Sequence, residues 1–259
     1  MSFCIADEMI DLWDEGLSHP ISYTDYVKYH LCPDIERSAE RKNEQKVLIS
    51  KVVNVLKERN HPGYEEAQAI FDRAMRAIEA LKLAVFPSFF KLIHYLDESG
   101  FRYTILFRTF GPDAPETANE LNQELGDEFI AEFHTIRKGA IDGKEELYGY
   151  ILKSNNHFAV QDDWKVWYQN NEEGAYGKYF PIDRKDRTRL SLFVDDNARI
   201  DLDRAERNAV RPYDAATGEK LSVIKLVDER RVFPVSTLEA LCDEDYFIKL
   251  VESALETEL

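Results

Sequence analysis

The hydrophobic period of the chain changes near Pro87, and this change constrains the fold more than any other feature of the sequence. Before it, apolar residues recur every three or four positions over 39–59 and again from Tyr64 to Leu81, as on one face of a helix. After it, helical segments alternate with short β-branched and aromatic runs that suit buried strands. We therefore expect a helical region over 1–86 and an α/β region over 87–259 with a doubly wound, mainly parallel sheet.

The α/β region begins with a predicted helix and strand. Ser88 is expected to cap the helix, Gly100 to end it, and Tyr103–Phe107 to form a buried strand directly afterwards. Leu190–Val194 is expected to form a second buried strand. The remaining expectations are a helix capped by Asp113, a small β insertion near 130–158 with a hairpin turn at Asp142-Gly143, a helix over 160–169, and a C-terminal helix after 243–245 that buries Phe247, Ile248, Val251 and Leu255.

Composition excludes several classes of protein. The 259 residues include 49 acidic and 33 basic side chains, and a formal net charge of -16 repels nucleic acid and anionic lipid. No stretch reaches the roughly 20 apolar residues that cross a bilayer, and the first residues do not resemble a signal peptide. The 3 cysteines form no cluster, which disfavours a disulfide framework or a zinc site. We expect a cytoplasmic protein that binds neither nucleic acid nor membrane.

Polar residues follow both predicted strands of the α/β region, where ligands gather in open sheets of this class. Thr109 comes two residues after the first strand, and a hydroxyl before a helix N-terminus suits an anion. Asp195 and Asp196 end the second strand and offer the hard oxygen ligands that Mg²⁺ prefers. In isolation, each also has an ordinary interpretation, Thr109 as a turn residue and the acidic pair as a helix cap.

The order of these residues resembles the haloacid dehalogenase-like (HAD) hydrolase superfamily over about Pro87 to Ala215. Phe107-Arg108-Thr109 is similar to the second family motif, Lys178 to the third, and 192–197 (Leu-Phe-Val-Asp-Asp-Asn) to the fourth. The resemblance implies Mg²⁺-assisted phosphoryl transfer on a Rossmann-like core. In that chemistry an Asp attacks phosphorus, Thr109 and Lys178 hold the phosphoryl oxygens, and Asp195 or Asp196 positions the metal.

The sequence departs from the family at the first motif, a strand followed by Asp-x-Asp that supplies the nucleophile. Asp7 is the only candidate near the N-terminus, and Met9 stands where the second carboxylate belongs. Asp201-Leu202-Asp203 has the spacing but follows the fourth motif, where it suits a helix start. Either the nucleophile strand lies upstream of Met1 or the chain is a non-catalytic relative. We expect little or no phosphatase turnover and weak or absent Mg²⁺ binding.

In this resemblance, residues 1–86 correspond to a helical cap. Its specificity candidates are Asp25, Tyr26, Tyr29 and His30, which are as readily explained by packing. Three functions stay open: a HAD-type phosphatase that lacks its nucleophile, a binding or regulatory protein that keeps the pocket for a phosphorylated small molecule or a protein partner, and a purely structural interaction protein.

Two geometric expectations follow from the resemblance. The strands 103–107 and 190–194 should lie in one sheet, as neighbours or one strand apart. Thr109, Lys178 and the Asp195/Asp196 carboxylates should converge on one point, because a phosphoryl group and its metal need all of them within a few ångström.

Overall fold

The structure is a computed structural model of the chain, and it describes residues 9–10, 21–22, 54, 57–58, 60, 64–81, 85–111, 114–126, 128–136, 144–153, 156–198 and 207–257. The chain forms two compact units. The first comprises 1–82 with 236–244, and the second comprises 83–235 with 245–259. Sequence analysis placed a single boundary after residue 86.

Among the described residues of the first unit, two helices come from distant parts of the chain. Helix α4 (Tyr64–Ala80) begins where the apolar period predicts it, and α10 (Thr237–Cys242) packs against it. Arg73 of α4 forms an ion pair with Glu239 of α10 at 2.6 Å. The strands β1 (Met9–Ile10) and β2 (Ile21–Ser22) pair antiparallel.

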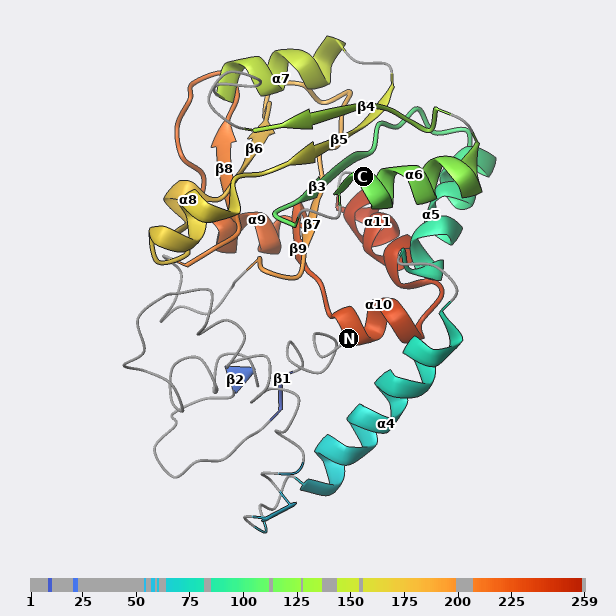
Figure 1. Cartoon of the computed structure of the whole chain (residues 1–259). Coiled ribbons are helices and arrows are strands. Elements are labelled where there is room, and N and C mark those ends of the chain that lie inside the picture. The colour runs from blue at the N-terminus through green and yellow to red at the C-terminus, as the bar shows by residue number, and fades with distance from the viewer. Residues whose placement is uncertain are drawn as a thin grey trace. The chain divides into compact units, whose positions relative to one another are not determined.

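The second unit opens with a three-stranded parallel sheet in the order β3-β5-β4 (Figure 1). Its strands are β3 (Leu106–Thr109), β4 (Ile130–Thr135) and β5 (His157–Gln161), and the helices that connect or precede them are α5 (Pro87–Glu98), α6 (Ala114–Leu125) and α7 (Lys144–Lys153). Phe158, Ala159 and Val160 of the central strand are fully buried, as expected for a parallel strand covered on both faces. Ala159 packs with Leu121 of α6 and with Val85 in one apolar core.

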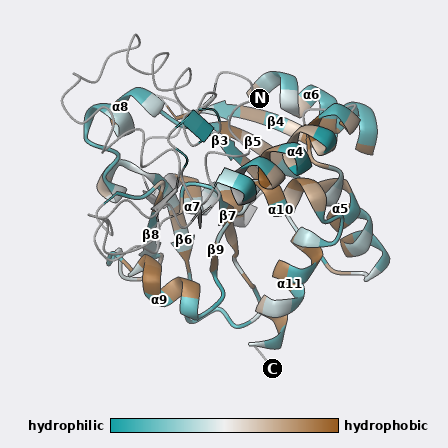
Figure 2. Cartoon of the chain, turned by 90° about the horizontal axis from the view of Figure 1, so that it is seen from below, coloured by the Kyte–Doolittle hydropathy of each residue, from teal (hydrophilic) through white to brown (hydrophobic). Residues whose placement is uncertain are grey.

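In the part of the second unit after β5 that the structure describes, there are two parallel strand pairs, β6-β8 and β7-β9. The elements are α8 (Trp164–Gln169), the short 3-10 helix η2 (Gly174–Tyr176), β6 (Lys178–Ile182), β7 (Phe193–Asp195), β8 (Val210–Asp214), α9 (Val223–Asp228), β9 (Val232–Pro234) and α11 (Tyr246–Glu256). A second core joins Phe180, Phe193, Val210, Leu226 and Val232. Helices α9 and α11 carry many hydrophobic residues (Figure 2), consistent with their packing roles.

The expected α/β class with short parallel strands is confirmed. Gly100 ends α5 with a positive φ of 69°, as the sequence predicts. The prediction that Ser88 caps α5 is wrong. Phe86 is the N-cap, Pro87 takes the first helical position, and Ser88 is buried. The two predicted strands also begin three residues later than expected, at Leu106 and Phe193.

Two local expectations are wrong between residues 130 and 169. The expected turn at Asp142-Gly143 lies outside the described residues, but the residues after it form helix α7 between two parallel strands, β4 and β5, and not the second strand of a hairpin. Parallel neighbours need a helical crossover, so the Asp-Gly pair precedes a helix here. The predicted helix over 160–169 is a strand in its first part, because Val160 and Gln161 complete the buried β5 and Asp163 caps the start of α8.

The expected placement of the two motif strands in one sheet is also wrong. Strand β3 pairs with β5, and β7 pairs with β9 in a different sheet. Among the described residues, no helix is long and apolar enough to cross a membrane.

Candidate functional site

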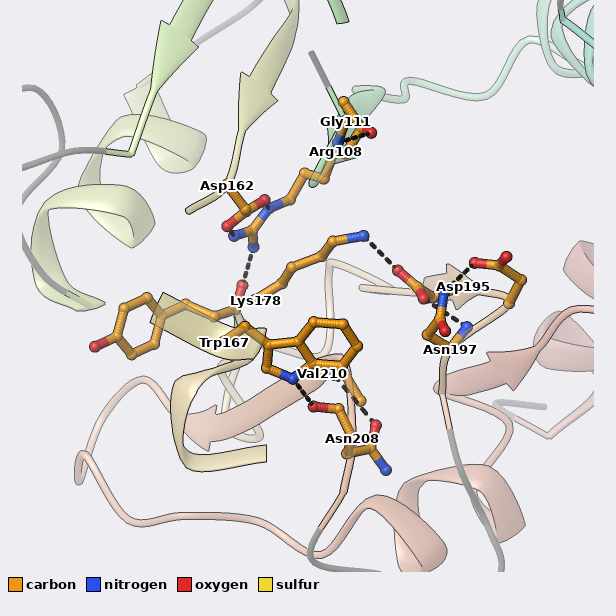
Figure 3. A network of polar contacts seen from close by, with 12 residues as sticks. Arg108, Gly111, Asp162, Trp167, Lys178, Asp195, Asn197, Asn208 and Val210 are labelled. Atoms are coloured by element: carbon orange, nitrogen blue, oxygen red, sulfur yellow. Dashed lines mark hydrogen bonds and ion pairs between the residues drawn. The ribbon is translucent and has the colours of Figure 1, made fainter. Parts of the chain in front are cut away.

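The start of strand β6 is the point where the sheets of the second unit come together. Lys178 and Tyr179 open this strand, and each contacts a different neighbouring sheet. Figure 3 shows the contact of Lys178 with Asp195. The Lys178 side chain reaches Asp195 at the end of β7, and the Tyr179 carbonyl accepts a hydrogen bond from Arg108 of β3. Two charged side chains therefore link three sheets within two residues of β6.

Lys178 and Asp195 form a buried ion pair. The Lys178 Nζ donates to Asp195 Oδ2 at 2.7 Å, and the two side chains are 7% and 6% exposed. The same ammonium lies 4.7 Å from the centre of the Phe110 ring, which adds a cation–π contact. Phe110 directly follows Thr109, so Lys178 spans from the carboxyl end of β3 to the carboxyl end of β7.

The lysine is positioned by tight backbone and aromatic packing. Its backbone N–H donates to the Ala209 carbonyl at 2.6 Å, and a Cβ on Gly177 would lie 2.6 Å from that same oxygen. Phe110 stacks on Trp167 with ring centroids 4.7 Å apart and planes at 8°, and Trp167 Nε1 donates to the Asn208 carbonyl at 2.9 Å. The ring beneath the ammonium is thereby fixed.

A second buried ion pair lies beside the first. Arg108 Nε donates to Asp162 Oδ2 at 2.9 Å, Nη2 donates to Oδ1, and Nη1 donates to the Tyr179 carbonyl. The side chains are 5% and 6% exposed. This two-pronged geometry matches the guanidinium fork to the carboxylate, so the pair ties β3, the end of β5 and β6 together.

Thr109 ends β3 at the edge of this network. Its Oγ1 accepts a hydrogen bond from the Gly111 N–H at 2.8 Å, the side-chain turn that is ordinary for a threonine after a strand. Its carbonyl accepts from the Asp162 N–H at 2.8 Å. The structure thus brings Lys178 and Asp195 into direct contact and places Thr109 one residue from the ring on which the ammonium rests.

The acidic pair at the end of β7 differs in environment. Asp195 is buried, and its Oδ1 accepts the Asn197 N–H at 2.8 Å. Asp196 is exposed, and its Oδ1 accepts the Asn197 Nδ2 at 2.8 Å. Both oxygens of Asp195 are therefore in use, and the described residues contain no group of three or more His, Cys, Asp or Glu side chains that could hold a metal. In this arrangement the donors do not fit a resident Mg²⁺, which requires near-octahedral oxygen coordination.

Other sequence candidates fall outside this network. Asp163 caps α8 by accepting from the Lys165 and Val166 N–H groups at 3.1 and 3.2 Å. Lying outside the described residues are Asp7, the cap candidates Asp25, Tyr26, Tyr29 and His30, the helix cap Asp113, and the Asp201-Leu202-Asp203 segment.

Sequence reasoning did not identify the Arg108–Asp162 pair. A signal for it exists, because an arginine inside an apolar strand run such as 105–110 (Ile-Leu-Phe-Arg-Thr-Phe) requires a buried acid. Sequence spacing does not identify which acid, because Asp162 lies 54 residues away.

Comparison of the chain with protein-family models, with curated proteins and with solved structures finds no match. The HAD resemblance therefore depends on the sequence motifs alone.

Proposed function

We propose that the second unit is a HAD-like core that binds a phosphoryl anion at Lys178 and Thr109 and acts as a binding or regulatory protein rather than as a phosphatase. The ligand is a phosphorylated small molecule or a phosphorylated protein partner. The cap role of residues 1–86 belongs to the same proposal, as does a cytoplasmic location.

One observation carries this proposal. The Lys178 ammonium rests between the Phe110 ring, next to Thr109, and the Asp195 carboxylate. A buried cation near the carboxyl ends of parallel strands is an arrangement that can receive anionic groups in α/β folds. Lysine serves here as a compact point charge with three N–H donors.

Binding without turnover follows from the missing nucleophile. In the described residues, no Asp-x-Asp follows a strand. Removing the nucleophile eliminates most chemical acceleration while binding groups continue to act. We expect the full chain to bind inorganic phosphate and to hydrolyse a generic phosphate ester at the background rate, with or without Mg²⁺.

The test combines calorimetric titration of inorganic phosphate with an assay of p-nitrophenyl phosphate hydrolysis. Lys178→Met and Thr109→Val should each weaken phosphate binding at least tenfold. The exposed lysine of the Lys225–Glu229 pair provides the matched control, and Lys225→Met should leave binding unchanged. Equal phosphate affinity in all four proteins would refute the binding site, and robust hydrolysis that is lost in Asp7→Asn would refute the absence of catalysis.

A further inference from the structure

The Lys178 ammonium is almost closed off from solvent, so a phosphoryl ligand needs a route to it. The side chain is 7% exposed, and the described contacts of its Nζ are the Asp195 carboxylate at 2.7 Å and the Phe110 ring, whose centre lies 4.7 Å away. Asp195 ends strand β7, where it pairs with Pro234 of β9. Phe110 lies outside the strands, directly after β3. Of these two contacts, the Phe110 ring is therefore the one that can move aside.

Residues 110 and 111 are held by side chains and not by the backbone of the sheet. Among the described residues, neither forms a backbone-to-backbone hydrogen bond. The Gly111 N–H donates to Thr109 Oγ1 at 2.8 Å, and the Gly111 carbonyl accepts from Gln161 Nε2 at 3.0 Å. Gln161 is the last residue of β5 and lies opposite Thr109 in the register of the two strands. The Gln161 side chain thus ties the residue after Phe110 to the central strand.

The strength of this tie suits a contact that opens and closes. A neutral hydrogen bond contributes little net stability, and breaking one shifts an equilibrium by roughly 2- to 10-fold. The Gln161–Gly111 bond is only partly buried, so water can replace each partner when the bond opens. Moving Phe110 also leaves the Lys178–Asp195 pair intact, so no buried charge loses its partner before the ligand arrives.

We propose that Phe110 is a gate over Lys178 and that the Gln161 side chain is the latch that keeps this gate closed. A phosphoryl anion reaches the ammonium from an open state, in which Phe110 has moved off Lys178 and Gly111 has left Gln161. The latch sets the fraction of open molecules, and the apparent phosphate Kd is the intrinsic Kd divided by that fraction. This inference rests on the proposed phosphoryl site and adds the way in which a ligand enters it.

The first experiment measures the exposure of the ammonium without any ligand. Reductive methylation of the full chain, followed by mass spectrometry of its peptides, gives the modification rate of each lysine. Gln161→Leu keeps the size of the side chain but removes the donor, and it should raise the Lys178 rate roughly 2- to 10-fold. Lys225, whose side chain is 63% exposed, is the internal control and should react equally in both proteins. An equal Lys178 rate in both proteins would overturn the proposal.

Two further variants test whether the effect belongs to the latch. Gln68 of α4 donates a side-chain hydrogen bond to Asp72 Oδ1 at 2.8 Å, and Gln68→Leu is the matched control that should leave the Lys178 rate unchanged. Phe110→Leu removes the flat ring of the gate and should raise the Lys178 rate at least as much as Gln161→Leu does. Should Gln161→Leu not fold, Gln161→Met takes its place with the same criterion.

The second experiment titrates inorganic phosphate calorimetrically into the unmodified chain and into Gln161→Leu. The phosphate Kd should be tighter in Gln161→Leu by the same factor as the Lys178 labelling rate rises, because a larger fraction of molecules is open. A substitution that merely loosens the fold does not tighten binding, so this readout distinguishes a latch from an ordinary structural contact. An equal or weaker affinity in Gln161→Leu would overturn the proposal.

The outcomes separate this inference from the proposed function. If Lys178 labelling rises in Gln161→Leu but neither protein binds phosphate, the gate over Lys178 stands and the phosphoryl function fails. If phosphate binds through Lys178 but Gln161→Leu changes neither the labelling rate nor the phosphate Kd, the function stands and the gate fails.

Discussion

The two buried ion pairs around the start of β6 have similar burial but different connections. Arg108 spreads its guanidinium over both oxygens of Asp162 and over the Tyr179 carbonyl, whereas the Lys178 ammonium has one hydrogen-bond acceptor among the described residues, Asp195. The planar Arg108 guanidinium is held in place because Nε, Nη1 and Nη2 each donate a hydrogen bond. A flexible lysine with a single partner and spare donors can be redirected. The comparison indicates a structural role for the first pair, and the proposed function gives the second pair a ligand-responsive role.

The largest expected effect comes from breaking the first pair. Asp162→Asn leaves the buried Arg108 charge uncompensated and should lower the free energy of unfolding by about 3–5 kcal/mol. Asp195→Asn should cost about 1–3 kcal/mol, because the lysine stem can turn its ammonium toward water. Urea unfolding of both variants measures the difference. A larger loss in Asp195→Asn would reverse the assignment of the two roles.

A smaller loss of stability is expected from a substitution at Gly177, which precedes Lys178 and should disturb only the Lys178–Asp195 pair. The φ of this glycine, -71°, suits any residue, but an added Cβ would meet the backbone of Ala209 at 2.6 Å. Gly177→Ala should therefore cost about 1–3 kcal/mol by overpacking and displace Lys178. Gly149 in α7 has nothing within 4 Å of the same Cβ. Gly149→Ala should be neutral or stabilising, and an equal loss at both glycines would show that the close approach at Gly177 has no effect.

Asp163 is the neighbour of Asp162 but caps a helix instead of forming a buried ion pair. Comparing its substitution with Asp162→Asn tests whether the buried ion pair causes the large loss of stability expected for Asp162→Asn. Asp163 caps α8 through two backbone N–H groups and is followed by the helix. Asp163→Ala should lower the free energy of unfolding by about 1 kcal/mol, the usual contribution of an N-cap. Urea unfolding alongside Asp162→Asn provides the comparison. A loss as large as that of Asp162→Asn would indicate that the whole turn, not the ion pair, stabilises this region.

The smallest effect is expected at the amino end of β5, away from both pairs. Burial lowers the pKa of His157 below its ordinary value of 6.5, partly offset by Asp97, and its Nδ1 accepts the Ile105 N–H at 2.9 Å. Because the unfolded chain binds this proton more readily, the stability contributed by neutral His157 should be complete above pH 6.5 and decrease as the pH falls below it. Melting temperatures at a series of pH values should show a shallower decline in His157→Gln. A steeper decline of the melting temperature in His157→Gln than in the unmodified chain would contradict the predicted direction of the pH dependence.

The α/β class and the helices were predictable because they depend on local patterns. The apolar period starts α4 at Tyr64, and Gly100 ends α5. The N-cap of α5 was less predictable. The proline ring fixes φ and favours the first helical position for Pro87, so the N-cap falls on Phe86 instead of Ser88. The segment after 160 has both strand and helix character, and only the pairing of β5 between β3 and β4 decides where the strand ends.

Site geometry was less predictable because it depends on contacts between distant residues. The motif order singled out Lys178 and Asp195, which are 17 residues apart and in contact. It also predicted one sheet for the two motif strands, which the pairing contradicts. Which acid would pair with Arg108 is a question of tertiary packing, and no local pattern in the sequence answers it.

The central claim is that Lys178 exchanges Asp195 for a phosphoryl anion. A crystal structure of the full chain grown with inorganic phosphate tests it most directly. We predict phosphate within hydrogen-bond distance of Lys178 Nζ and Thr109 Oγ1, with the ammonium moved off Asp195 and the Arg108–Asp162 pair unchanged. An intact Lys178–Asp195 contact at 2.7 Å, with phosphate bound elsewhere or absent at saturating concentration, would contradict it.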